Sequence, residues 1–264
     1  MQPFRVSVPQ AVLDDLSDRL GRSRLPNQVS GIEWEQGTPR DYLDELLDHW
    51  RHRYDWRATE DRLNAHEHFT TEVDGQRIHF LHVRSSRADA LPIVITHGWP
   101  GSVMEFLDVI DDLRRDFHLV IPSLPGFTFS GPTSERGWHP RRIAAAFGTV
   151  LERLGYERYG LQGGDWGSSV STNLADLHPE RVAGLHLNMV TARRPSDDAI
   201  VTAEERAVIE RTMEWRRTGA AYQEIQGTKP QSLGYGIEDS PSGLAAWIVE
   251  KFKEWSHGDI REAF

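Results

Sequence analysis

The middle of the chain alternates short apolar runs with amphipathic stretches, and this alternation limits the fold more than any other feature. The apolar runs are too short for buried helices, whereas their length is usual for buried strands. They are PIVIT (92–96), HLVIPSLPG (118–126), YGLQGG (159–164) and AGLHLNMV (183–190). The stretches between them have apolar residues at helical spacing. Because strands that alternate with helices form βαβ units, the pattern predicts a mostly parallel sheet flanked by helices.

Helical patterns also occupy both flanks of this region. Before it, the spacing of apolar residues predicts short helices within VLDDLSDRL (12–20), DYLDELLDHWRHRYDW (41–56) and TEDRLNAHEHF (59–69). The segment FTTEVDGQRIHFLHVR (69–84) alternates around Asp-Gly, which predicts a β-hairpin. After residue 190, two further helices and no further strand are predicted, in TAEERAVIERTMEWRRTG (202–219) and SPSGLAAWIVEKFKEWS (240–256).

The composition argues against several classes of protein. The 264 residues carry a formal net charge of −10, which disfavours a nucleic-acid partner. The chain has no cysteine, so neither disulfides nor a thiolate metal site can form. The N-terminus has no basic flank before an apolar stretch, and no window approaches the roughly 20 apolar residues of a membrane span. We therefore expect a cytoplasmic protein without a signal peptide or a membrane anchor.

A sharp turn around an aspartate lies in LQGGDWGSS (161–169), between a predicted strand and a predicted helix. This pattern is that of the nucleophile elbow of α/β-hydrolases, with aspartate where esterases carry serine. Gly163 and Gly167 would let the strand and helix backbones approach each other. Asp165 would then project beside the N-terminus of the helix, which favours an ionised carboxylate. The alternative is an aspartate that caps a helix after a glycine turn.

An aspartate at this position indicates a particular chemistry. A serine must lose a proton before it attacks, whereas a carboxylate is already charged at neutral pH. Carboxylates are modest nucleophiles that suit displacement at a saturated carbon and give an alkyl-enzyme ester. Asp165 therefore points to epoxides or alkyl halides and away from amides and ordinary esters. A serine esterase is disfavoured because the chain has no G-x-S-x-G motif.

A second motif, HGWPGS (97–102), directly follows the apolar run at 92–96. Hydrolase folds place half of an oxyanion hole at this strand end. The backbone N–H groups of Trp99 and Trp166 could therefore converge on one oxygen, orient the second oxygen of Asp165 and stabilise the charge that forms when water cleaves the ester. The alternative is a Gly-Pro turn with a buried tryptophan.

With these motifs, the chain resembles the microsomal-type epoxide hydrolases of the α/β-hydrolase superfamily. HGWPGS, PSLPGFTFSG (122–131) and LQGGDWGS match that family's core in order and spacing. The N-terminal helical patterns resemble the segment that wraps the core and leans on the lid in that family, and residues 220–255 resemble the start of its helical cap. The resemblance implies an α/β-hydrolase fold with an N-terminal helical wrap segment (1–65), a hydrolase core (66–190) and a partial helical cap (191–264).

The resemblance also implies roles for individual residues. Asp165 matches the nucleophile, and the backbone N–H groups of Trp99 and Trp166 match the oxyanion donors. The segment HGWPGS (97–102) corresponds to the oxyanion loop of that family, and His97, Gly98 and Pro100 match positions that support it.

Tyr222 matches one of two cap tyrosines that hydrogen-bond the epoxide oxygen and help to protonate it. A phenol suits this role because it stays protonated at neutral pH yet is far more acidic than an alkoxide. The alternative for Tyr222 is a half-buried aromatic at a helix end, and we expect Tyr235 to be structural. No metal or organic cofactor is implied; the expected partners are a small hydrophobic epoxide and water, and a homodimer is left open.

Three groups of the resembled family have no counterpart in the sequence: the catalytic acid, the histidine and the second cap tyrosine. His97 belongs to the oxyanion loop, His186 reads as a core histidine within a strand, and His257 has no assigned role. We therefore expect a fragment of a longer enzyme, alkylated once at most by a reactive epoxide because no histidine would activate water. Two alternatives remain: a haloalkane dehalogenase, which uses the same D-W-G elbow, and a non-catalytic, truncated hydrolase-like binding protein.

Overall fold

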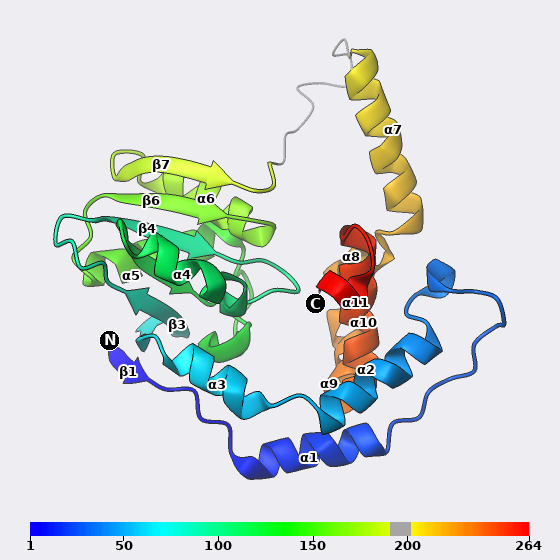
Figure 1. The fold of residues 1–264 in the computed structure, drawn as a ribbon. Helices are drawn as coiled ribbons and strands as arrows, with labels where there is room; N and C mark the ends of the chain where they lie inside the picture. The colour runs from blue at the N-terminus through cyan, green and yellow to red at the C-terminus, as the bar shows by residue number, and fades with distance from the viewer. Residues whose placement is uncertain (191–201, 264) are drawn as a thin grey trace. The chain divides into compact units, whose positions relative to one another are not determined.

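The computed structural model describes residues 1–190 and 202–263 of the chain. The chain divides into two compact units. The core unit comprises Met1–Ser7 and Asp55–Ala192, and the helical unit comprises Val8–Tyr54 and Arg193–Phe264. Figure 1 shows the elements of both units. Of the helices in the described residues, none is both long and apolar enough to span a bilayer.

The core unit is built on one mixed sheet with the strand order β1-β2-β3-β5-β4-β6-β7. β5, β4, β6 and β7 are parallel, whereas β1, β2, β3 and β5 pair antiparallel. The strands are β1 (Gln2–Phe4), β2 (His68–Val73), β3 (Gln76–Val83), β4 (Leu91–Thr96), β5 (Phe117–Pro122), β6 (Tyr159–Gly163) and β7 (Val182–Leu187). The predicted hairpin and the predicted parallel strands are therefore confirmed. The sequence did not predict β1, which extends the antiparallel half.

Helices cover both faces of this sheet. They are α3 (Trp56–Asn64), η2 (Val103–Phe106), α4 (Leu107–Leu113), η3 (Thr128–Ser130), α5 (Pro140–Arg153) and α6 (Trp166–Leu177). Successive residues of β5 pack on opposite faces: Val120 joins the apolar cluster of α5 and α6, whereas Leu119 and Ile121 join the cluster that contains α3 and α4 residues. Both faces are thus buried, which explains why the strand reads as a continuous apolar run.

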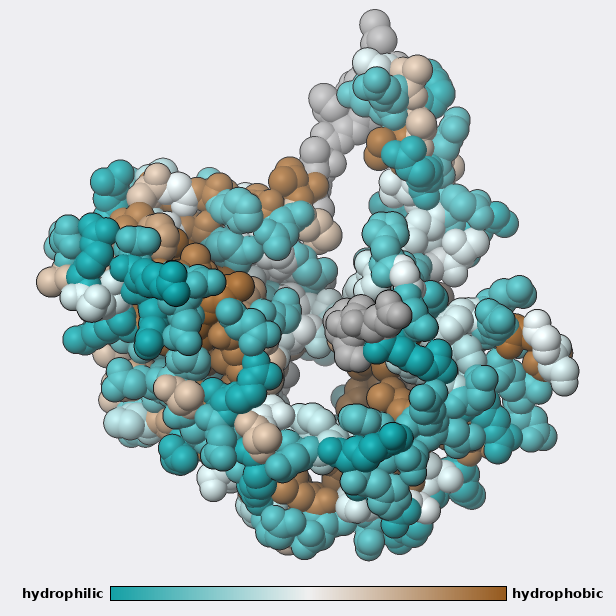
Figure 2. All heavy atoms as spheres, in the orientation of Figure 1, coloured by the Kyte–Doolittle hydropathy of each residue, from teal (hydrophilic) through white to brown (hydrophobic). Residues whose placement is uncertain are grey.

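β7 forms one end of the described sheet and is poorly covered. Leu185 is 41% exposed and His186 is also exposed. The expectation that His186 is a core histidine was therefore wrong, because no described helix buries this part of the edge strand. A groove of about 480 Å³ runs over β4, β6 and β7 and is lined largely by apolar residues, including Ile93, Ile95 and Leu161. Hydrophobic side chains reach the surface of the core unit (Figure 2).

The helical unit joins the N-terminal helices to the helices expected to form the cap. Its elements are α1 (Gln10–Gly21), η1 (Trp34–Gln36), α2 (Arg40–His52), α7 (Ala203–Thr218), α8 (Ala221–Thr228), α9 (Pro230–Asp239), α10 (Pro241–Trp255) and α11 (Ile260–Ala263). Leu20 of α1, Leu43 and Leu47 of α2 and Ala245 of α10 form one buried cluster. Helices α1 and α2, within Val8–Tyr54, therefore pack on α10 from far along the sequence, whereas β1 and α3 belong to the core unit.

Burial holds two histidines of β3 in the neutral form. Burial lowers the pKa of His79 to about 3, and the neighbouring His68 and Arg77 lower it further because a second positive charge beside them is unfavourable. Burial also lowers the pKa of His82 to about 4, helped by Arg84 and His118. Both pKa values lie below the roughly 6.5 of a histidine in an unfolded chain. At a pH between each folded-state pKa and about 6.5, the unfolded state therefore binds more protons than the folded state.

We therefore expect the free energy of unfolding to fall as the pH drops below about 6.5. At pH 5 the loss should be about 2 kcal/mol for each of these two histidines. Urea unfolding at pH 7.5 and at pH 5, followed by circular dichroism, measures the difference. His82→Gln should remove one share of the loss, whereas the control His186→Gln, at an exposed position in the same unit, should leave it unchanged. An identical pH dependence for wild type and His82→Gln would contradict this account.

Candidate active site

Asp165 occupies a strained turn between β6 and α6. β6 ends at Gly163 and α6 begins at Trp166, so the two elements are separated by two residues. Asp165 has φ +50° and ψ −125°, a region that residues with a β-carbon rarely adopt. Such a conformation costs on the order of 1–3 kcal/mol and persists only where the surrounding structure enforces it. The turn places the half-buried Asp165 side chain at the carboxyl end of the parallel strands.

Three glycines make this turn possible. A β-carbon on Gly163 would collide with the carbonyl of Gly167, and one on Gly167 would collide with the carbonyls of Thr96 and His97. The expected close approach of strand and helix backbones at these glycines is confirmed. A β-carbon on Gly98 would collide with the Asp165 side chain, so the oxyanion loop also depends on a missing side chain.

The two motifs singled out in the sequence meet at this turn. β4 and β6 are parallel neighbours, with Thr96 opposite Gly163, so HGWPGS and the elbow leave the sheet side by side. The backbone N–H of Trp99 donates a hydrogen bond of 2.8 Å to Asp165 Oδ1. Trp166, the second expected donor, is the first residue of α6, and its side chain is 54% exposed.

His97 is held as a structural member of the oxyanion loop. Its Nδ1 lies 2.9 Å from the carbonyl oxygen of Gly98, and its Nε2 lies 3.1 Å from the backbone nitrogen of Leu124. A carbonyl can only accept and an amide can only donate, so Nδ1 carries the proton and Nε2 is the acceptor. Burial lowers the pKa of His97, which favours this neutral ring. Both nitrogens are engaged, and His97 is therefore not available as a base.

The rest of the loop is fixed locally. The peptide bond between Trp99 and Pro100 is cis. Ser102 and Glu105 form a capping box at the start of η2: the Ser102 amide donates to Glu105 Oε1 at 2.9 Å, and the Met104 amide donates to Ser102 Oγ at 3.2 Å. This support was not predicted, although the spacing Ser-x-x-Glu directly after HGWPG is a signal for it.

This arrangement presents a carboxylate with one oxygen held. Among the described contacts, Oδ1 accepts the Trp99 amide, so Oδ2 is the oxygen that can attack an electrophile. The N-terminus of α6, with its outward-facing backbone N–H groups, follows directly after Asp165. The distance from the Trp99 nitrogen to Oδ1 lies in the range of an oxyanion-hole donor.

Tyr222 lies in the helical unit, in the first turn of α8. Its side chain is buried, more deeply than the half-buried aromatic weighed as an alternative. Its hydroxyl accepts a hydrogen bond from Gln223 Nε2 at 3.0 Å. Its ring packs against Trp255, with centroids 5.6 Å apart, and Lys251 Nζ lies 4.6 Å from the ring centroid. Tyr235, expected to be structural, is instead 71% exposed, because it lies on an uncovered face of α9.

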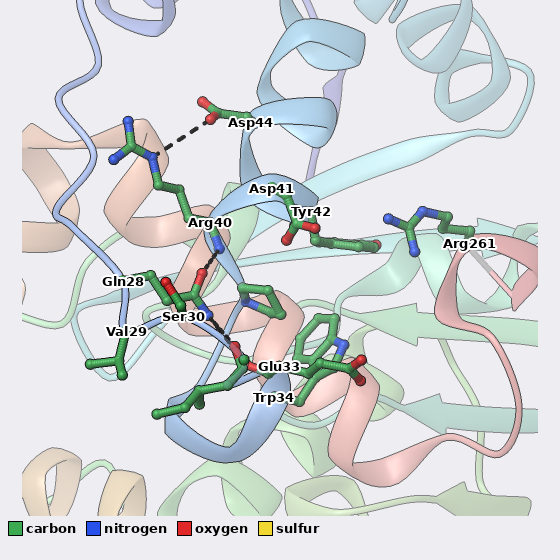
Figure 3. Close-up of a pocket in the computed structure, with 13 residues that line it drawn as sticks. Gln28, Val29, Ser30, Glu33, Trp34, Arg40, Asp41, Tyr42, Asp44 and Arg261 are labelled. Carbon is green, nitrogen blue, oxygen red and sulfur yellow. Dashed lines mark hydrogen bonds and ion pairs between the residues drawn. The ribbon is translucent and has the colours of Figure 1, made fainter.

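No metal site accompanies these residues: in residues 1–190 and 202–263, no group of three or more His, Asp or Glu side chains could hold a metal ion. A separate surface pocket of about 660 Å³ lies in the helical unit, between the loop before α2 and the start of that helix (Figure 3). Trp34 and Tyr42 meet edge to face there at 5.1 Å, and Arg261 lies over the Tyr42 ring. None of the residues predicted to be functional lines this pocket.

Comparisons with known proteins agree with this site. The family described as "Epoxide hydrolase N terminus" matches residues 1–106, and the family described as "alpha/beta hydrolase fold" matches residues 92–234. A protein of Stigmatella aurantiaca is 44% identical over 96% of this chain and 60% of its own length. Epoxide hydrolase 1 of Oryctolagus cuniculus is 34% identical over 99% of this chain and 64% of its own. The chain thus spans about three-fifths of the length of the curated relatives it matches.

Solved structures give the same result. The epoxide hydrolase of Aspergillus niger superposes with a TM-score of 0.88 at 34% identity, covering 99% of this chain and 72% of that one. The juvenile hormone epoxide hydrolase of Bombyx mori superposes with a TM-score of 0.89 at 30% identity, covering 97% of this chain and 66% of that one. These relatives agree with the aspartate elbow beside HGWPGS on this sheet. The chain therefore belongs to the epoxide hydrolase family of the α/β-hydrolase superfamily.

Proposed function

We propose that Asp165 opens a hydrophobic epoxide by forming a covalent ester, the first half of epoxide hydrolysis to a vicinal diol. Asp165 Oδ2 forms a bond to one ring carbon while the bond from that carbon to the epoxide oxygen breaks. The electron pair moves to the oxygen, which takes a proton from the phenol of Tyr222. The observation that carries this proposal is the strained elbow, where the Trp99 amide holds Oδ1 and leaves Oδ2 to attack.

The Trp99 amide would also serve the second half-reaction. After Oδ2 is alkylated, Oδ1 becomes the carbonyl oxygen of the ester. When water adds to that carbonyl, Oδ1 acquires negative charge at the position where the Trp99 N–H already donates. We assign the Trp166 amide, at the start of α6, as the second donor to this oxyanion.

The proposed substrates are a hydrophobic epoxide and water, with no cofactor. The names of the relatives support the epoxide, since they include an epoxide hydrolase 1 and a juvenile hormone epoxide hydrolase. Activation of the water needs a base, and both ring nitrogens of His97 are engaged. We therefore propose that this chain forms the ester faster than it hydrolyses it.

We expect styrene oxide to add to the 264-residue chain once, giving a mass increase of one epoxide per chain. Intact-mass spectrometry over time measures the adduct. Asp165→Ala should abolish it because the nucleophile is gone. Asp176→Ala, which removes an exposed carboxylate further along the same helix, should leave it unchanged. Many turnovers to diol by the purified chain, or an adduct that survives in Asp165→Ala, would contradict the proposal.

A dehalogenase remains the second candidate because the exposed Trp166 indole directly follows the nucleophile and could bind a leaving halide. The same assay with 1-bromobutane distinguishes the two functions. An adduct from the bromide but none from the epoxide would favour the dehalogenase.

We expect Tyr222→Phe to slow alkylation by styrene oxide by about 100-fold or more, because the epoxide oxygen then leaves without a proton donor. Where the wild-type chain also reacts with 1-bromobutane, that alkylation should be unaffected, since bromide departs without a proton. Single-turnover rates of adduct formation measure both. Equal slowing with the two reagents would mean that the substitution perturbs the protein generally and that Tyr222 is not the acid.

A further inference from the structure

A chain of hydrogen bonds, buried except at its end on Thr128, connects β2 and β3 to the loop that follows β5. His68 of β2 and His79 of β3 are 3% and 0% exposed, and their rings are joined by a bond of 2.8 Å from Nδ1 of His68 to Nε2 of His79. At one end, His68 Nε2 lies 2.7 Å from the carbonyl oxygen of Leu63. At the other end, His79 Nδ1 lies 2.9 Å from Ser123 Oγ, which accepts from Thr128 Oγ1 at 2.7 Å.

The chemistry of its ends fixes the direction of this chain. The Leu63 carbonyl can only accept, so His68 carries its proton on Nε2 and accepts at Nδ1. His79 must then donate from Nε2 and accept at Nδ1 from the hydroxyl of Ser123. The Ser123 oxygen in turn accepts the proton of Thr128. Each neutral ring thus donates once and accepts once, and the rings of Phe4 and Phe129 pack edge-on against His79.

Ser123 is the point at which this chain holds the loop. Besides its two side-chain bonds, its amide donates to the His79 carbonyl at 2.9 Å. Its carbonyl accepts from the Ser130 hydroxyl at 2.6 Å, and the Ser130 oxygen accepts from the His79 amide at 3.0 Å. Thr128 has φ +40°, a strained value for a β-branched residue, and its side-chain bond to Ser123 helps to hold it there.

Leu124, the residue after Ser123, connects these hydrogen bonds to the active site. The Leu124 amide donates to His97 Nε2 at 3.1 Å, and His97 Nδ1 donates to the Gly98 carbonyl at 2.9 Å. The following amide, that of Trp99, donates to Asp165. The buried histidines are therefore linked to the oxyanion loop by consecutive hydrogen bonds and adjacent residues, all within the core unit.

We propose that His68, His79 and Ser123 are positioning residues that orient the Trp99 amide toward the Asp165 carboxylate. The kinetic part of this inference rests on the proposed function, whereas the structural part does not. If the chain of bonds only stabilised the core, breaking it would lower the melting temperature and leave the Trp99 amide unchanged.

Two substitutions break this series of hydrogen bonds at different points. Ser123→Ala removes the donor to His79 Nδ1, whereas Thr128→Val removes only the last donor and keeps the bond between Ser123 and His79. The matched control is Ser85→Ala, because Ser85 is also buried in the core unit and its hydroxyl donates to the Arg115 carbonyl, outside this chain of bonds. If Ser123→Ala does not fold, Thr128→Val decides.

The direct readout is the nuclear magnetic resonance signal of the Trp99 amide. Isotope labels on glycine carbonyl carbon and tryptophan nitrogen select Gly-Trp pairs, which occur in the sequence as Gly98–Trp99 and Gly137–Trp138. Trp138→Phe assigns the two signals. We expect Ser123→Ala and Thr128→Val to move the Trp99 signal to higher field and to speed its hydrogen exchange, because the bond to the carboxylate weakens, while Ser85→Ala does neither.

The rate of alkylation by styrene oxide, measured per folded molecule well below the melting temperature, should fall about tenfold or more in Ser123→Ala and stay unchanged in Ser85→Ala. An unchanged Trp99 signal in Ser123→Ala, or in Thr128→Val where Ser123→Ala does not fold, would overturn the inference. If the wild-type chain is not alkylated at all, the proposed function fails, and the amide signal still decides whether these residues position Trp99.

Discussion

The hydrogen bond from the Trp99 amide to Asp165 is the interaction on which the site depends. It joins two residues 66 positions apart, and it forms only because their strands are parallel neighbours in the sheet. Glycine at 98, 163 and 167 lets three backbone segments approach closely enough, and the positive φ of Asp165 aims the carboxylate at the amide. The hydrogen bond of 2.8 Å between the Trp99 amide and Asp165 therefore depends on the strand order, on the placement of the glycines and on the strained backbone of Asp165.

Much of this arrangement could be predicted from the sequence because its signals are local. Apolar runs that alternate with helical patterns predicted the parallel strands, and Asp-Gly predicted the hairpin of β2 and β3. The small residues around Asp165 predicted a tight strand-to-helix turn. Two motifs that each follow a strand could be expected to meet, since parallel strands share one carboxyl edge.

Other features depend on contacts that no local pattern reveals. β1 is only three residues long and is a strand because β2 offers it an edge. The exposure of His186 depends on the position of β7 in the sheet order, which the apolar neighbours of that histidine did not indicate. His68 fell in the stretch 59–69 predicted to be helical, and His79 fell in the predicted hairpin. In the structure His68 begins β2, and the connection of His79 to Ser123 requires the pairing of β3 with β5.

The account's central claim, that Asp165 bonds covalently to carbon, is tested most directly by following a heavy oxygen atom. The ester formed with an epoxide is cleaved by mild alkali in water labelled with heavy oxygen, and the tryptic peptide 159–181, which contains Asp165 and Asp176, is fragmented in a mass spectrometer. Because hydroxide attacks the acyl carbon, one heavy oxygen should appear in the Asp165 side chain and none in the diol. Heavy oxygen in the diol alone, or in Asp176, would contradict the claim.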